Sequence, residues 1–430
     1  MRKIDAVILI EHINRELESA VLLKKELVQR GYTVEIVSAF WDFGTAIVKY
    51  SPKIIITPWG YDDWEMNLLR SFYGAGNDGN FKILNLHHEQ MTYADAQAFM
   101  MPRGSAKKSY HIAWGEYYKE MLLKEEVLSK QICVTGSPRL DLFSEKYKSL
   151  SVTKKQLAEQ YGLDEKQKWI MFLGNFSFAY FPQEKVQQQF ERGNKAAYEL
   201  AEESKYMLVE LTKWIDKVCD RRRDIEIIYR PHPSEKVFQK HEELLRKYSN
   251  FHVIKDKTVR DWIVNIDVAY TWNSTSSVEV ASANKPVYAL RPRPVSESLT
   301  IEMLREIPAV ESISQLLETI DQVVKGNIVN CDDLFKKKLE FYYSQGDKSA
   351  TEKTADFIEN ILQENGYEFQ SINKKYSFKR WCTFIKQKIK RGLLHTGMIK
   401  ASKKYMLQKN DYFNSKDVLL IENKISKGFN

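Results

Sequence analysis

Two short polar segments of the chain hold residue types that suit the binding of a phosphate group. The first contains Arg230 and His232, within the sequence Tyr-Arg-Pro-His-Pro (229–233). An arginine carries a permanent positive charge, and a histidine can donate both a hydrogen bond and a proton. Prolines on both sides of His232 restrict the backbone and hold the imidazole in place. An isolated His-Pro pair also fits a loop whose histidine only bonds a neighbouring carbonyl, and taken alone this second interpretation is the stronger one.

The second polar segment is a run of side chains at the expected start of a helix: Asn273, Ser274, Thr275, Ser276 and Ser277. Hydroxyl groups beside the N–H groups of a helix start form an anion site. An ordinary helix cap explains one serine or threonine, but not four in succession. Glu279, two residues further on, is expected either to bind ribose hydroxyls or to complement the helix dipole, and the two interpretations have equal weight.

Both segments follow predicted strands, as does a third loop that contains Gly174 and Asn175. In open α/β sheets, ligands bind at the carboxyl ends of the strands. One helix–strand crossover separates the segments at 229–233 and 272–277, so we expect both at the same sheet edge. Together they predict a site for the nucleotide and phosphate of an activated sugar.

A transferase also needs a base that deprotonates the acceptor hydroxyl. His87, His88 and Glu89 follow the predicted strand over 81–86. We favour Glu89 as the base, with His88 or His87 as the alternative. Two adjacent histidines at a strand end point to opposite sides, so we expect no bound metal.

Further candidates for an acceptor pocket follow other predicted strands of the N-terminal half. Glu11 and His12 come after the strand over 6–10, and they are the weaker candidates. Residues after the strand over 53–57 are expected to shape the pocket, together with His87: Trp59, Tyr61 and Asp62.

The elements that would position these residues are predicted from alternating apolar and amphipathic stretches. Strands are predicted over 6–10, 33–38, 53–57, 81–86, 109–114, 131–136, 168–175, 225–230, 251–256, 267–272 and 286–290. Helices are predicted over 15–30, 62–73, 116–128, 192–220 and 258–264, and from about 276. Such alternation specifies parallel sheets covered by helices. We therefore predict an α/β protein with two Rossmann-like domains facing each other across a cleft, the architecture of the B-type (GT-B) glycosyltransferases.

The pattern also predicts domain boundaries. Residues 1–145 form the acceptor-side domain, and residues 146–330 form the domain that binds the nucleotide-sugar donor. Helices over 331–368 are expected to pack back across the domains. Residues 369–430 are expected to form a basic amphipathic helical tail.

The Arg-Pro-His-Pro sequence, followed by the Ser/Thr run and Glu279, resembles the donor domain of bacterial surface-polysaccharide glycosyltransferases. These include the Kdo transferases, the sialyl- and polysialyltransferases with a His-Pro motif, and the teichoic-acid glycerophosphate transferases. The resemblance implies that His232 and Ser274–Ser277 hold the donor phosphate, in an enzyme of capsule or lipopolysaccharide synthesis. The sequence VTGSPRLDLF (134–143) is a second point of resemblance, to surface-carbohydrate biosynthesis proteins. Glu89 partly matches an acidic element of the sialyltransferases, and the resemblance covers roughly residues 130–290.

No Asp-x-Asp triplet occurs in the chain, although metal-dependent A-type transferases need one to hold a divalent cation. Its absence favours stabilisation of the leaving phosphate by protein groups and predicts a metal-independent enzyme. This fits a nucleoside monophosphate leaving group and hence a CMP-sugar, and a nucleoside diphosphate is the alternative. The nucleotide-sugar is a substrate, so no cofactor is expected.

Charge is distributed unevenly along the chain. The net charge is +8, but residues 371–410 contain twelve Lys or Arg and no Asp or Glu, so subtracting these twelve charges leaves −4 for the rest. Trp381, Phe384, Ile385, Ile389 and Leu393 recur near helical spacing within this stretch, which is typical of a helix that binds an anionic membrane surface. A solvated helix that packs on the body is the alternative. Nucleic acid is not an expected partner, because the body of the chain is acidic.

The four cysteines are far apart, and no apolar run is long enough to span a membrane. The predicted location is therefore the cytoplasm, at the inner face of the cell membrane. The expected function is transfer of a sugar from a nucleotide-activated donor to an acceptor. The expected acceptor is a surface glycan or a lipid-linked molecule. A CDP-polyol phosphotransferase of the teichoic-acid type is one alternative. Others are an enzyme like UDP-GlcNAc 2-epimerase, which would not need a basic tail, and a non-catalytic glycan-binding assembly protein.

Overall fold

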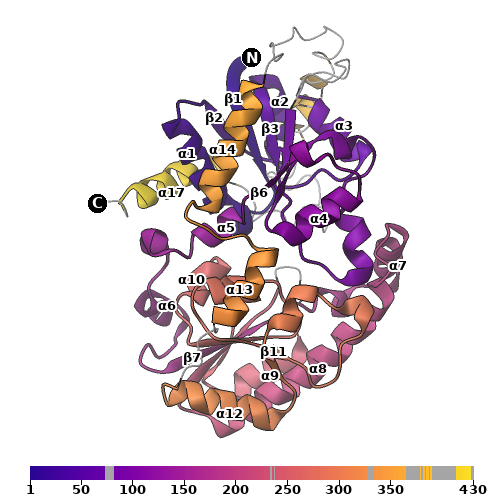
Figure 1. Cartoon of the computed structure of the whole chain (residues 1–430). Helices are drawn as coiled ribbons and strands as arrows, with labels where there is room; N and C mark the ends of the chain where they lie inside the picture. Colours follow the sequence, from indigo (N-terminus) through magenta and orange to yellow (C-terminus); the bar gives the residue numbers. More distant parts are fainter. Residues whose placement is uncertain are drawn as a thin grey trace. The chain divides into compact units, whose positions relative to one another are not determined.

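The computed structural model describes residues 1–72, 82–232, 235–236, 238–327, 333–364, 378, 381–382, 384–386, 388–389 and 413–427. Pro233 and most of the predicted tail, Leu393 included, lie outside the described residues. The chain forms two compact units (Figure 1). Unit 1 comprises residues 1–90, 101–142 and 341–430, and unit 2 comprises residues 91–100 and 143–340. No helix in the described ranges is both long enough and apolar enough to cross a membrane.

Unit 1 is built on a six-stranded parallel sheet with the order β2-β1-β3-β4-β5-β6. Its strands are β1 (Arg2–Ile10), β2 (Val34–Ser38), β3 (Tyr50–Thr57), β4 (Lys82–Asn85), β5 (Tyr110–Ala113) and β6 (Ile132–Val134). Central strands that are buried on both faces need apolar side chains at successive positions, which explains the apolar runs at 6–10 and 54–56. Val7 lies opposite Ile55 of β3 and Glu35 of β2.

Helices cover this sheet, and some differ from the predicted ones. The predicted helix over 15–30 is divided into a π-helical segment, η1 (Ile13–Leu17), and α1 (Glu18–Gln29). Side chains of α2 (Phe43–Lys49) and α3 (Asp63–Arg70) join the strands in one apolar cluster, and α4 (Glu116–Lys124) packs beside β5 and β6. The short helix α2 was not predicted, because it has only seven residues and no distinct apolar period.

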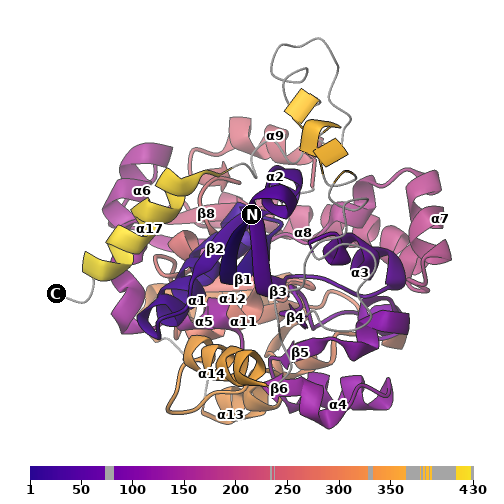
Figure 2. The same cartoon turned by 90° about the horizontal axis from the view of Figure 1, so that it is seen from above.

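The C-terminal part of the chain returns to unit 1. Helices α14 (Ala350–Gln363) and α17 (Ser415–Lys427) both lie beside α1 (Figures 1 and 2). Arg30 at the end of α1 pairs with Asp356 at 2.7 Å and Glu359 at 3.2 Å, and Lys24 pairs with Glu422 at 2.9 Å. The first and last parts of the chain therefore complete the same unit.

Unit 2 is built on a second parallel sheet of six strands, with the order β12-β11-β10-β7-β8-β9. Its strands are β7 (Lys168–Leu173), β8 (Ile225–Arg230), β9 (Phe251–Val253), β10 (Val268–Thr271), β11 (Val287–Leu290) and β12 (Ala309–Val310). The helices α8 (Ala197–Arg221) and α12 (Ile313–Val324) contact each other and share one apolar core with the strands. The prediction of an α/β protein with two parallel sheets is confirmed.

Candidate functional site

The topology of unit 2 brings the predicted donor-binding loops together. The strands β10, β7 and β8 are neighbours in the sheet, and a parallel sheet puts their carboxyl ends at one edge. The chain order reverses between β7 and β10, and ligands of open α/β sheets bind outside the carboxyl ends at such a switch point. The loop with Gly174 and Asn175 and the run at 273–277 lie on the two sides of this point.

Asparagines join these two loops. The Asn175 side-chain amide donates to the backbone carbonyl of Asn273. Asn273 is buried and donates through its own amide to the carbonyl of Leu299 at 3.2 Å. The structure therefore brings Asn175 and Asn273 together, and both hold loops in place through hydrogen bonds within the protein. Their predicted contact with a nucleotide stays a prediction.

The hydroxyl run precedes α11 (Ser277–Ser282), which begins close to the predicted position. Ser274, Thr275 and Ser276 are half-buried, whereas Ser277 and Glu279 are buried. The Ser274 hydroxyl accepts a hydrogen bond from the backbone N–H of Ser276 at 3.3 Å. The Ser277 hydroxyl has no hydrogen-bond partner among the described residues. The first three hydroxyls are thus more accessible than Ser277 and Glu279, and the predicted ligand contacts of all five residues stay predictions.

Arg230 makes its hydrogen bonds within unit 2. Its guanidinium donates to the carbonyls of Asp256 at 2.9 Å and Lys257 at 2.7 Å, and it lies 3.5 Å from that of Ile254. Burial lowers the pKa of Arg230 to about 10, which leaves it charged at neutral pH. The side chain therefore holds the loop after β9 in place, and its predicted contact with a phosphate stays a prediction.

His232 is exposed, yet it is held at two points. Its Nδ1 lies 2.9 Å from the Ser177 hydroxyl, and its backbone N–H donates to Glu235 Oε1 at 2.9 Å. Ser177 follows β7 and His232 follows β8, so two adjacent loops fix the imidazole. Such fixation favours a defined role at the surface, because an unconstrained side chain would lose more conformational freedom when it binds a ligand.

Glu235 is the residue that the sequence reasoning missed. Its buried carboxylate accepts from Tyr229 Oη at 2.8 Å, from the N–H of Phe176 at 2.8 Å and from the N–H of His232. Burial raises the pKa of this carboxyl group. The spacing was a usable signal, because a glutamate three residues after His232 can bond that residue's N–H as in a capping box.

Gly174 is explained by the same group. A Cβ atom at this position would lie 2.6 Å from Tyr229 Oη and 2.9 Å from Glu235 Oε1. Only glycine leaves room for the hydrogen bond between these two side chains. The presence of glycine at position 174 is therefore explained without a nucleotide, and its predicted contact with one stays a prediction.

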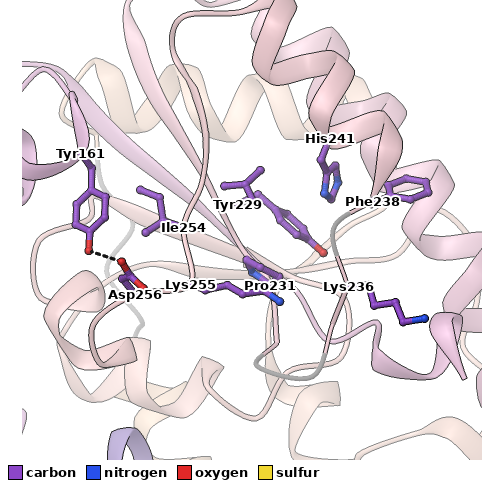
Figure 3. Close-up of a pocket in the computed structure, with 10 residues that line it drawn as sticks. Tyr161, Tyr229, Pro231, Lys236, Phe238, His241, Ile254, Lys255 and Asp256 are labelled. Carbon is purple, nitrogen blue, oxygen red and sulfur yellow. Dashed lines mark hydrogen bonds between the residues drawn. The ribbon is translucent and has the colours of Figure 1, made fainter. Parts of the chain in front are cut away.

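A cavity of about 300 Å³ lies beside the His232 loop in unit 2 (Figure 3). It is lined by side chains of both charges and several rings: Tyr161, Tyr229, Pro231, Lys236, Phe238, His241, Val253, Ile254, Lys255 and Asp256. Tyr161 Oη lies 3.4 Å from an Asp256 carboxylate oxygen on one side, and Phe238 and His241 lie on the other. The volume is at the lower end of the roughly 300–1,000 Å³ of small-molecule sites.

In unit 1, the predicted acceptor-side residues follow β1, β3 and β4. The chain order reverses between β1 and β3, which are neighbours, so this edge also has a switch point. Glu11 and His12 lie on one side of it, and Trp59, Tyr61 and Asp62 lie on the other. All five lie at the carboxyl end of the sheet, as predicted.

Several of these residues have structural roles. Asp62 caps α3, because its Oδ1 accepts from the N–H of Glu65 at 2.9 Å. His87 is only 1% exposed, and its ring nitrogens lie 3.0 Å from His111 Nδ1 and 3.0 Å from Tyr118 Oη. Tyr61 is also buried, at 3.4 Å from the same His87 ring. These contacts are all within the protein, and the predicted place of Tyr61, Asp62 and His87 in an acceptor pocket stays a prediction.

His88 is half-buried, and its tautomer follows from one contact. Its Nδ1 lies 3.0 Å from the carbonyl oxygen of Pro58, which can only accept a hydrogen bond. The proton of the neutral ring is therefore on Nδ1, and Nε2 carries the lone pair. Burial, with a further effect of the positive Arg15, lowers the pKa of His88 to about 4. The imidazole is then neutral at pH 7 and can accept a proton.

Charged groups surround His88. Arg15 pairs with Glu16 at 2.6 Å and lies 3.7 Å from Glu11, and the charge of Glu89 is among those that raise the pKa of Arg15. Burial acts to raise the pKa of Glu16, but the charge of Arg15 and, to a smaller extent, the interaction with His88 lower it, and the net result is a lowered pKa. The sequence reasoning missed Arg15 and Glu16 because a helix was predicted there. The π-helical turn η1 that carries them is a type often found at functional sites.

Comparison with solved structures shows the same fold in distant proteins. The UDP-GlcNAc 2-epimerase from Neisseria meningitidis, bound to UDP-GlcNAc, is 13% identical with a TM-score of 0.51, over 84% of this chain and 100% of that chain. MnaA of S. aureus, in a structure with UDP, is 14% identical with a TM-score of 0.50, over 87% and 100%. The wall teichoic acid polymerase TagF is 12% identical with a TM-score of 0.52, over 84% and 89%.

No family model matches the sequence, and no match was found among curated proteins. At such low identities the structural similarity shows the fold alone. The predicted GT-B-type fold is thereby confirmed, and the similar structures are those of enzymes.

Proposed function

We propose that this chain is a metal-independent transferase that moves a sugar from a nucleotide-activated donor to a glycan or lipid-linked acceptor. The observation that carries the proposal is the exposed His232, fixed by Ser177 and Glu235 at the carboxyl end of β8. The half-buried hydroxyls of residues 274–276 follow β10 at the same sheet edge. Hydrogen-bond donors held in place are what a leaving phosphate requires.

In the proposed reaction, an acceptor hydroxyl oxygen bonds to the anomeric carbon of the sugar. The bond from that carbon to the donor phosphate breaks, and the phosphate oxygen takes the electron pair. His232 and the hydroxyls of Ser274, Thr275 and Ser276 donate hydrogen bonds to this oxygen and its neighbours. The proton of the acceptor hydroxyl passes to a general base.

We propose that His88 is the general base. The sequence alone favoured Glu89 for this role. The Nδ1–H of His88 is held by the Pro58 carbonyl, so Nε2 presents a lone pair. The carboxylate of Glu16, whose charge acts to raise the pKa of His88, would stabilise the imidazolium that forms, as a carboxylate beside a catalytic histidine does. Glu89 already accepts from the N–H of Gln90 at 3.2 Å.

We further propose that a cytidine nucleotide carries the sugar and that its base enters the cavity of Figure 3. Tyr161 and Phe238 offer ring surfaces to a flat base, and the Asp256 carboxylate can accept from an exocyclic amine. A variant of TagF was solved after soaking with CDPG. Uridine lacks the amine, and it is the alternative because UDP is present in the MnaA structure.

Isothermal titration with CMP, CDP and UDP tests donor binding. His232→Ala should weaken the binding of CMP about 10- to 100-fold, the effect of losing one hydrogen bond to a charged group. Lys240→Ala, an exposed cation of α9 (Gln239–Lys247), is the control and should change the affinity less than twofold. Equal affinities of wild type and His232→Ala would reject the phosphate role, and preference for UDP would reject cytidine.

Transfer of a polyol phosphate from CDPG is a second candidate, which the similarity to TagF supports. Incubation with CDPG and with CMP-sugars, followed by analysis of the released nucleotide, separates the two. Release of CMP from CDPG but not from any CMP-sugar would favour polyol-phosphate transfer. Conversion of UDP-GlcNAc to its 2-epimer without acceptor would instead favour the epimerase reaction.

A further inference from the structure

The described residues of the segment 378–389 carry an exposed apolar surface. The described residues of this segment are helical. Four large side chains are strongly exposed: Phe378 at 73%, Trp381 at 52%, Ile385 at 48% and Ile389 at 56%. Apolar side chains of this size are buried in most proteins, and contiguous exposed ones mark interaction sites.

These four residues share one side of the helix. At about 100° per residue, Phe378, Trp381, Ile385 and Ile389 fall within an arc of about 80°. Lys388 and Lys386 fall on the two sides of that arc. The Lys388 ammonium lies 5.6 Å from the ring centre of Phe384, which stacks edge-on against Trp381 at 5.4 Å. The result is a narrow apolar face with aromatic groups and with cations along both edges.

Another helix of the same unit shows what packing on the body looks like. Val418 and Ile425 of α17 are 6% and 1% exposed, Phe413, two residues before the helix, is 5% exposed, and α17 lies against α1. The apolar side chains of 378–389 have no such cover among the described residues. These exposed fractions favour a surface that contacts a partner over a helix that packs on the body.

We propose that the face formed by Phe378, Trp381, Ile385 and Ile389 binds the surface of an anionic lipid bilayer, with the helix lying in the plane of the interface. Charge favours this partner, because residues 371–410 carry +12 and the remainder of the chain −4. Lysines at the edges of an apolar face extend toward lipid headgroups while rings enter the interface. The proposal is independent of the reaction assigned to the enzyme.

Flotation of the full-length protein with vesicles tests this. We expect binding to vesicles of phosphatidylcholine mixed with phosphatidylglycerol, and at least about tenfold weaker binding to phosphatidylcholine alone, since each lysine near the surface contributes to anionic binding. The double substitution Trp381→Ala/Ile385→Ala should weaken binding to the anionic vesicles by about tenfold or more. Trp64→Ala is the matched control, because Trp64 is 71% exposed in α3 of the same unit.

Charge is tested separately. Lys386→Glu/Lys388→Glu should weaken anionic binding about tenfold or more, whereas the same change of charge at the exposed Lys416 and Lys424 of α17 should have a smaller effect. All these residues are exposed, so unfolding midpoints should stay within a degree or two of wild type. Equal binding by Trp381→Ala/Ile385→Ala and Trp64→Ala would overturn the proposal. Binding of single-stranded RNA without binding to either vesicle would assign the surface to nucleic acid instead.

Discussion

At the scale of single residues, His88 and Glu89 show how neighbours in sequence acquire different properties. The backbone N–H and the ring Nδ1 of His88 both lie within hydrogen-bond distance of one carbonyl, that of Pro58. The ring is thereby fixed in position and tautomer, while Glu89 bonds the N–H that follows it. A sequence shows only that a histidine and a glutamate follow a strand, so it could not choose between them.

The low pKa of His88 predicts the pH dependence of catalysis. A general base must be unprotonated before it can accept a proton. A histidine of ordinary pKa, about 6.5, becomes protonated as the pH falls below that value, whereas His88, with a pKa of about 4, stays unprotonated to a much lower pH. We expect kcat/KM with the preferred donor to stay constant from pH 8 down to about pH 5, where a histidine of ordinary pKa would already be protonated. Circular dichroism at each pH shows whether the protein is folded.

His88→Gln keeps a hydrogen-bond donor but not the base, and should lower kcat by about 100- to 10,000-fold with little change in donor affinity. Glu89→Gln is the comparison and should cost less. A larger loss of kcat in Glu89→Gln than in His88→Gln would return the role of base to Glu89.

For the pH dependence, activity that declines near pH 6.5 while the enzyme is still folded would contradict the low pKa of His88.

Glu235 predicts a coupling between stability and donor binding. Glu235→Ala leaves the N–H groups of Phe176 and His232 and the hydroxyl of Tyr229 without their acceptor. We expect the free energy of unfolding to fall by about 3 kcal/mol, and CMP to bind more weakly because the His232 loop is released. Urea unfolding and titration calorimetry measure the two effects. The exposed Glu243→Ala on α9 is the control, and loss of stability without loss of CMP affinity would separate Glu235 from the donor site.

At the scale of elements, the turn after β7 requires a residue without a side chain, Gly174. A Cβ atom at position 174 would meet Tyr229 Oη at 2.6 Å, so Gly174→Ala should destabilise the protein by about 1–3 kcal/mol. Tyr229→Phe removes the nearest atom, and the double variant should lose less than the sum of the single losses. Chemical unfolding of the four proteins gives this coupling. Strict additivity would show that the clash is relieved elsewhere.

The elements differ in how well the sequence predicts them. Strands such as β1 and β3 are buried on both faces, so each gives an apolar run that is visible without a structure. The π-helical turn η1 has a helix-like sequence pattern, so its altered geometry is not visible in the sequence. In the structure, Glu16 of this turn pairs with Arg15 and accepts from the N–H of Glu11. Likewise Arg230 has carbonyl partners far along the chain, which no local pattern reveals.

At the scale of the whole molecule, buried neutral histidines predict sensitivity to acid. Burial lowers the pKa values of His111 and His241 to about 4, and that of His87 falls as well. The unfolded chain, with ordinary histidines, binds more protons below pH 6.5, so the free energy of unfolding falls as the pH drops from 6.5 toward 4. A shift of this size is worth up to about 3 kcal/mol for each fully buried ring.

Urea unfolding at pH 7, 6 and 5 measures this loss. His241→Gln should flatten the dependence on pH relative to wild type. Identical slopes for His241→Gln and wild type would mean that His241 titrates normally in the folded protein.

The discontinuous make-up of unit 1 has a consequence for the order in which the protein forms on the ribosome. Arg30 meets Asp356 and Lys24 meets Glu422, so α1 awaits residues made some three hundred or more positions later. Residues 143–340 supply nearly all of unit 2 and emerge earlier. At about 5–20 residues per second, the last segment needs several seconds more. Unit 1, whose first residues are synthesised earliest, is thus the last to be completed. In that interval, the side of α1 that later contacts α14 and α17 is where a chaperone would be needed.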